Sequence, residues 1–139
     1  MPGAIGTLAQ RSSIAFAASY LVTGTIGLIL NPDFGTGTGT SAEQFLVDWN
    51  GWHAVLTLLL VPAALFAAAR PARATRFLAY NAVANGITAT WALFDRTPLG
   101  ILDLPNVATD VALHLTLTAG SAALLLVQLR RDRVVPAHA

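Results

Sequence analysis

The chain has 139 residues, which is enough for one domain. Hydrophobic residues make up 55% of it and charged residues only 11%, whereas soluble domains carry about 25% charged residues. This composition, with a net charge of +1 and no cysteine, excludes several classes. The excluded classes are soluble enzymes with a charged shell, disordered chains, disulfide-stapled secreted domains and nucleic-acid binders with a basic surface. We expect a single integral membrane domain over residues 1–139.

Four apolar segments follow one another along the chain, separated by stretches that hold the charged residues. A membrane helix needs roughly 20 mostly apolar residues to cross about 30 Å of hydrocarbon. We therefore expect an all-α, four-transmembrane-helix bundle with spans at about residues 12–30, 51–69, 77–94 and 107–129. The third span is the least apolar. The first is long and lacks a clear small-residue cleavage site, which favours a span over a cleavable signal peptide.

The segment between the first two spans differs in composition from the rest. Residues 35–40 form a Gly-Thr repeat, which is typical of a flexible, low-complexity stretch. Residues 41–47 predict a short interfacial helix. Trp49 and Trp52 then come where the second span enters the bilayer, as in the aromatic belts of membrane proteins.

The arginines divide unevenly between the loops. Seven of the eight lie before the first span, between the second and third spans, or after the fourth. Only Arg96 lies in the other two loops, which hold most of the acidic residues. The positive-inside rule therefore places both termini and the middle loop in the cytoplasm. We expect a multi-pass protein of the cell's inner membrane in this orientation.

The two halves of the sequence align without a gap when one is shifted by 61 residues. Phe16 then meets Phe77, and His53 meets His114. The histidine match carries weight, because histidine is rare inside membranes. Each half holds two spans, so the pattern predicts two parallel two-helix repeats about an axis along the membrane normal. Small residues that would let the helices pack closely are Ala17, Gly24, Gly27, Ala82, Gly86, Ala119 and Gly120.

Three ionisable residues lie within the predicted spans, where an unpaired charge is costly. His53 and His114 come about one turn inside the outer boundary, and Asp110 precedes His114 by four residues on the same helix face. One interpretation is structural, with these side chains hydrogen-bonded between helices. The alternatives are ligation of a haem b iron by His53 and His114, a metal site formed by both histidines and Asp110, and a proton or solute path.

Further polar residues are expected inside the bundle, because lipid offers them no hydrogen-bond partners. On the third span Asn81 and Asn85 are four residues apart and share a face. They either form hydrogen bonds that hold neighbouring helices together or line a small polar cavity. The predicted polar interior consists of Thr57, Asn81, Asn85, Asn106 and Thr118.

Several of these features occur together in one known family. They are the stretch from Tyr20 to Gly27, the sequence Asn50-Gly51-Trp52-His53, the arginine-rich middle loop, and Asn106 with Asp110 and His114. From about Phe16 to Leu129 the chain resembles a family of small four-span membrane proteins from high-GC bacteria, described as a domain of unknown function. The resemblance implies the four-span fold and no particular activity. In that family the second and fourth spans usually begin with an Asn followed shortly by His, and either Asn106 or Asp110 takes that place here.

The usual catalytic patterns are absent from the sequence. It has no cysteine nucleophile, no glycine loop followed by lysine for phosphates, and no His-Glu-x-x-His. We therefore expect a non-enzymatic accessory or assembly subunit in the lipid bilayer, which packs against other membrane subunits or a second copy and binds no nucleic acid. The rival interpretation is a b-type haem or metal-binding redox or transport protein that uses His53 and His114.

Overall fold

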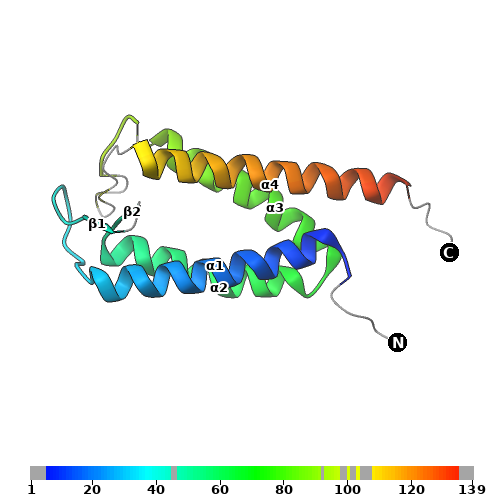
Figure 1. Ribbon diagram of the computed structural model, residues 1–139, viewed down its shortest axis with the longest axis horizontal. Helices are drawn as coiled ribbons and strands as arrows, with labels where there is room; N and C mark the ends of the chain where they lie inside the picture. The colour runs from blue at the N-terminus through cyan, green and yellow to red at the C-terminus, as the bar shows by residue number, and fades with distance from the viewer. Residues whose placement is uncertain are drawn as a thin grey trace.

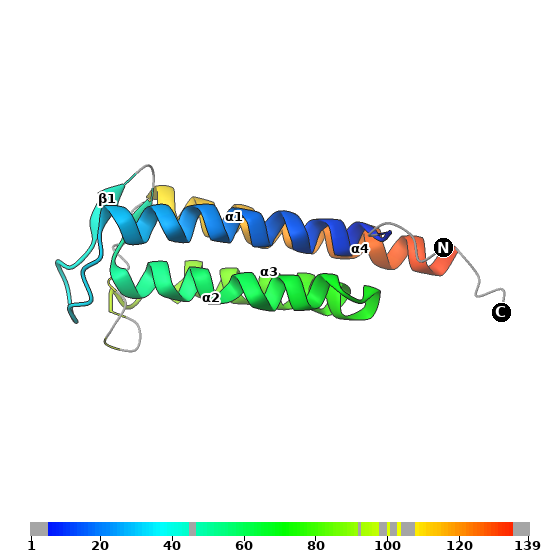
Figure 2. The same ribbon diagram turned by 90° about the horizontal axis from the view of Figure 1, so that it is seen from below.

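The computed structural model describes residues 6–44, 47–91, 93–97, 100, 103 and 108–134. Four helices account for most of these residues: α1 (Leu8–Leu30), α2 (Gly51–Ala68), α3 (Pro71–Trp91) and α4 (Ala108–Val134). The helices α1 and α2 pack as one pair, and α3 and α4 pack as the other. Figures 1 and 2 show these pairs as two layers, so that α1 lies over α4 and α2 lies over α3. The predicted all-α class with four helices is confirmed.

Three of the four helices, α1, α2 and α4, are long and apolar enough to cross a membrane. These three helices therefore have the length and composition that the predicted spans require. Helix α3 has 21 residues, but it includes Arg73 and Arg76 in its first turns and two asparagines further on. The crossing by α3 stays a prediction.

The helices extend beyond the predicted spans at three of their ends. Helix α1 begins four residues early because Thr7 caps it. The Gln10 amide donates to the Thr7 hydroxyl over 3.2 Å, and the Thr7 amide donates to the Gln10 side chain over 3.3 Å. Helix α3 begins at Pro71, since proline is well suited to a first helical position. Helix α4 continues to Val134, past Arg130 and Arg131, which follow the predicted end of the span at residue 129.

A small antiparallel hairpin lies between α1 and α2 at one end of the bundle. Strand β1 (Ala42–Gln44) pairs with β2 (Val47–Trp49), so that Ala42 lies opposite Trp49. The predicted interfacial helix over residues 41–47 is therefore wrong. Asn31, which follows α1, donates to the carbonyls of Thr40 and Trp49 over 2.9 and 2.7 Å. These bonds hold the two ends of the hairpin side by side, which a helix over the same residues would not allow.

Two glycines of α1 allow close packing, Gly24 against α2 and Gly27 against β2. A Cβ atom at Gly27 would lie 2.5 Å from the ring of Trp49, and one at Gly24 would lie 2.8 Å from Leu58. Both contacts are shorter than side chains tolerate, so these positions need glycine as the sequence predicted. Gly120 differs, because no described atom lies within 4 Å of a Cβ added there.

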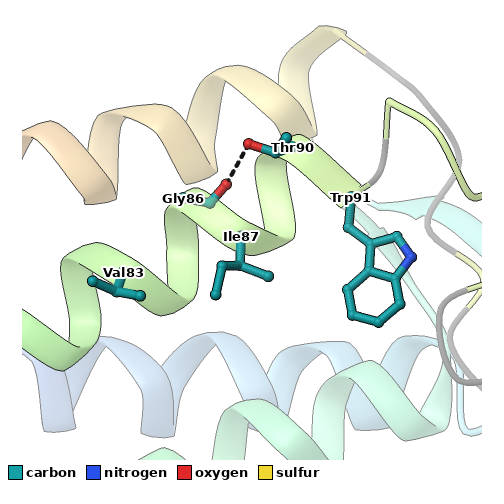
Figure 3. A pocket seen from close by; sticks show the side chains of 5 residues that line it. All are labelled: Val83, Gly86, Ile87, Thr90 and Trp91. Carbon is teal, nitrogen blue, oxygen red and sulfur yellow. Dashed lines mark hydrogen bonds between the residues drawn. The ribbon is translucent and has the colours of Figure 1, made fainter.

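Helix α3 has an exposed apolar surface. Val83, Ile87 and Trp91 follow each other at four-residue spacing, and each is more than a third exposed. With Gly86 and Thr90 they line an open groove, which Figure 3 shows beside the α1–α2 pair. The Thr90 hydroxyl donates to the Gly86 carbonyl over 2.8 Å. Its polar atom is therefore satisfied within the helix.

Candidate functional site

The structure brings His53 and His114 together. His53 lies near the start of α2, whose first turn is capped by Asn50: the Asn50 side-chain oxygen accepts from the His53 amide over 2.9 Å. His114 lies on α4, and the centroids of the two rings are 6.2 Å apart at an interplanar angle of 21°. The Asn-x-x-His pattern of the second span is thus a helix cap that fixes where His53 stands.

Asn85 fixes the orientation and tautomer of His114. The Asn85 amide group donates to the Asn81 carbonyl over 2.9 Å, so its oxygen points to His114, where it lies 2.8 Å from Nδ1. An amide oxygen only accepts, and Nδ1 therefore carries a proton. The other nitrogen, Nε2, lies 3.8 Å from an Asp110 carboxylate oxygen, which is beyond hydrogen-bond length. Asp110 and His114 are neighbours, as the four-residue spacing predicts, but they are not directly hydrogen-bonded.

The two histidines have different neighbours at the same helical spacing. Trp49 precedes His53 by four residues, and its ring centroid lies 4.6 Å from that of His53. Asp110 takes the corresponding place before His114 and is buried. The His53 ring therefore contacts an aromatic ring, and the His114 ring lies beside a carboxylate.

Asn81 is the centre of a buried hydrogen-bond network. It accepts from the Tyr20 hydroxyl, and its amide donates to the Ser121 hydroxyl over 2.9 Å. Asn85 donates to the Asn81 side chain over 3.3 Å, which continues the network to His114. The network joins α1, α3 and α4, and both asparagines are buried. Sequence analysis missed Tyr20 and Ser121 as members, although Tyr20 meets Asn81 in the 61-residue alignment.

The structure describes two of the three remaining polar residues that were predicted for the interior, Thr118 and Thr57. Thr118 turns onto its own helix, where its hydroxyl donates to the His114 carbonyl over 2.9 Å. Thr57 lies beside the histidine pair and lines the cavities described next. Asn106 lies outside the described residues.

Two cavities flank the histidine pair. One has a volume of about 140 Å³ and lies between α1 and α4, and the other has about 230 Å³ and lies between α2 and α3. Pockets for drug-sized ligands measure about 300–1,000 Å³, so neither cavity holds the macrocycle of a haem. Within the described ranges, no three His, Cys, Asp or Glu side chains are placed to hold a metal ion. Ligation of a haem or a metal ion by His53 and His114 stays a prediction.

A second buried carboxylate, that of Asp103, connects the α1–α2 segment with the α3–α4 segment. One carboxylate oxygen accepts from the amides of Gly39 and Ser41 over 2.7 and 3.1 Å, and the other lies 3.2 Å from Nε of Arg96. Burial alone would raise the pKa of Asp103, but these donors outweigh it and hold the pKa below its usual value. Sequence analysis missed this residue, since a single acid in a loop gives no motif.

The cytoplasmic end of the bundle, as predicted from the arginines, is tied by two glutamines. Gln128 of α4 accepts from the Ala9 amide over 3.1 Å, at the start of α1. Gln10 donates to the Ala68 carbonyl over 2.8 Å, at the end of α2. Both bonds use backbone groups that the helix ends leave without partners of their own.

A family model covers residues 10–127 of the chain and is described as a domain of unknown function, DUF4383. The chain belongs to the DUF4383 family. This match covers nearly all of the helical region, from the first turn of α1 to the last turns of α4. No curated protein and no solved structure matches the chain. Together with the apolar helices, the match identifies a multi-pass membrane protein of the DUF4383 family, whose description assigns no activity.

Proposed function

We propose that the chain crosses the inner membrane four times, with both termini in the cytoplasm. The arrangement of α3 supports the fourth crossing: Asn81 and Asn85 are buried, and the outward surface is apolar. The hydroxyls of Thr88 and Thr90 donate to carbonyls of their own helix over 3.0 and 2.8 Å. In this arrangement the two asparagines are buried and the two threonines are hydrogen-bonded, so none of the four polar side chains faces lipid without a hydrogen-bond partner.

Cysteine labelling in intact cells tests this orientation. The chain has no cysteine, so Thr38→Cys reports only on the outer loop and Ala72→Cys only on the α2–α3 turn. We expect a membrane-impermeant thiol reagent to label Thr38→Cys at once and Ala72→Cys only after the cells are permeabilised. The reverse pattern would invert the topology, and labelling of both sites in intact cells would remove the crossing by α2, which lies between them.

The proposed parallel repeat is supported by contacts between equivalent residues, meaning residues that meet in the 61-residue alignment. The rings of Phe16 and Phe77 lie 6.2 Å apart, as do those of His53 and His114. Tyr20 donates a hydrogen bond to its own equivalent, Asn81. Residues contact their own equivalents when they lie beside a two-fold axis. We therefore place the histidine pair on a pseudo-two-fold axis of the bundle.

Within the membrane, we propose a non-enzymatic accessory or assembly subunit that packs through its helices. The observation that carries this proposal is the interior network, in which buried polar side chains hold one another. Tyr20, Asn81 and Ser121 are used in bonds between helices, and Asn85 positions His114. The outward faces are apolar and suit partner helices. Leu126 on α4, for example, is 55% exposed.

Site-specific photo-crosslinking in native membranes tests the subunit proposal. A photoreactive residue at Leu126 is expected to give discrete protein adducts, at twice the chain's mass if the partner is a second copy. The same residue at Thr38, exposed in the outer loop, is the matched control and is expected to give none of these adducts. Adducts with lipid alone at Leu126 would count against a partner on that face.

A further inference from the structure

The two cavities beside the histidine pair are related by the internal repeat. Both are lined by the histidines, Thr57, Leu60 and Asn85. Five residues of the α1–α4 cavity, which form four equivalent pairs because both histidines line both cavities, have equivalents that line the α2–α3 cavity. The pairs are Ser19 with Tyr80, Thr23 with Ala84, His53 with His114, and Leu117 with Leu56. The internal repeat therefore gives the bundle one such cavity on each side of the pseudo-two-fold axis.

Each cavity has a rim at the surface of a membrane-spanning helix. Ser19 and Thr23 of α1 are exposed at the rim of the smaller cavity. Tyr80 of α3 is 55% exposed at the rim of the larger one. Because these residues lie in the middle of their helices, a ligand would reach either cavity from the hydrocarbon of the membrane.

Thr57 offers the cavities a polar group. Its equivalent, Thr118, is bonded to the His114 carbonyl over 2.9 Å. Thr57 lines both cavities, and its hydroxyl makes no such bond in the part of the chain that the structure describes. A hydroxyl in mainly apolar surroundings gains stability when a ligand supplies its hydrogen bond.

The size and walls of the cavities indicate the shape of the occupant. A dry cavity of about 150 Å³ lined by apolar side chains is known to bind benzene. The smaller cavity here, at about 140 Å³, has that size, and its lining includes the aromatic residues Trp49, His53 and His114 and the apolar residues Leu60 and Leu117. We propose that the two cavities are equivalent sites for lipid-soluble molecules with one six-membered ring bearing an oxygen that bonds to Thr57, as in phenols and quinone head groups.

Fluorine NMR of 4-fluorophenol with the protein in lipid nanodiscs tests the two sites. We expect two saturable bound signals. Thr23→Leu should remove one and Ala84→Leu the other, because these equivalent positions lie on different cavities. Gly120→Ala, where added bulk meets nothing, should keep both. The absence of saturable signals, with partition into lipid only, would overturn the proposal, as would two signals that survive both leucine substitutions in folded protein.

Thr57→Val tests the hydrogen bond without changing the shape of the cavities. The valine variant should bind 4-fluorophenol about threefold to tenfold more weakly, which corresponds to one ordinary hydrogen bond. Binding of 4-fluorotoluene, which has no hydroxyl, should be unchanged and should match the weakened value. Equal affinity for the two probes in the wild-type protein would refute the role of Thr57. Circular dichroism melting of each variant verifies that it is folded.

Discussion

Replacing Asn81 with leucine is expected to lower the free energy of unfolding by about 2 kcal/mol, because three hydrogen bonds at roughly 0.6 kcal/mol each are lost inside the membrane. Asn81 is buried and its side chain bonds to Tyr20, Ser121 and Asn85. Leucine has a similar size, so the loss reflects the polar atoms left without partners rather than a cavity. Denaturant unfolding in mild detergent measures the difference.

Tyr20→Phe is the matched control for this prediction. It removes one hydroxyl from the same network and keeps the ring stacked against Phe16, whose centroid is 6.0 Å away. We expect a loss of about 0.6 kcal/mol, near the average for one bond in a membrane protein. An Asn81→Leu variant as stable as the wild type would show that the network contributes nothing to stability.

Replacing Asp103 with asparagine is expected to cost about 2–3 kcal/mol, since hydrogen bonds to a charged group are worth more than neutral ones. The buried carboxylate accepts from the amides of Gly39 and Ser41 and faces the guanidinium of Arg96. Arg96→Gln is the control, because Arg96 is 55% exposed and a surface ion pair contributes only about 0–1 kcal/mol. Equal losses in the two variants would contradict a leading role for the amide bonds.

Asp103 also predicts how stability depends on pH. Its pKa in the folded protein is lowered by the Ser41 and Gly39 amides and Arg96, which outweigh the effect of burial. A carboxyl with a lowered pKa stabilises the fold above its unfolded pKa of about 3.9, and this contribution is lost as the pH falls through the folded value. Melting temperatures at pH 7 and pH 3 should therefore differ more for the wild type than for Asp103→Asn. The comparison between variants isolates Asp103 from Asp95, whose pKa is lowered as well by its bonds with Thr97 and Trp91.

The helices were largely predictable from the sequence because they depend on local composition. Apolar segments of membrane-spanning length, separated by charged stretches, predict where α1, α2 and α4 lie. Their ends were less predictable, since caps such as Thr7 and Pro71 extend a helix beyond the apolar run. The 61-residue repeat also indicated which residues are equivalent, and this relation recurs in the contact between His53 and His114.

The loops and the polar centre were decided by tertiary structure. Strands β1 and β2 lie beside the end of α1, where Asn31 binds the carbonyls of Thr40 and Trp49, a contact between segments that no local pattern encodes. Asp103 and Ser121 became significant only when the fold placed donors and acceptors around them. The sequence by itself determined the apolar character and the helices, because these follow from composition and spacing along the chain. Only the tertiary structure decided which polar groups meet, because a hydrogen bond depends on distances of about 3 Å between atoms far apart in sequence.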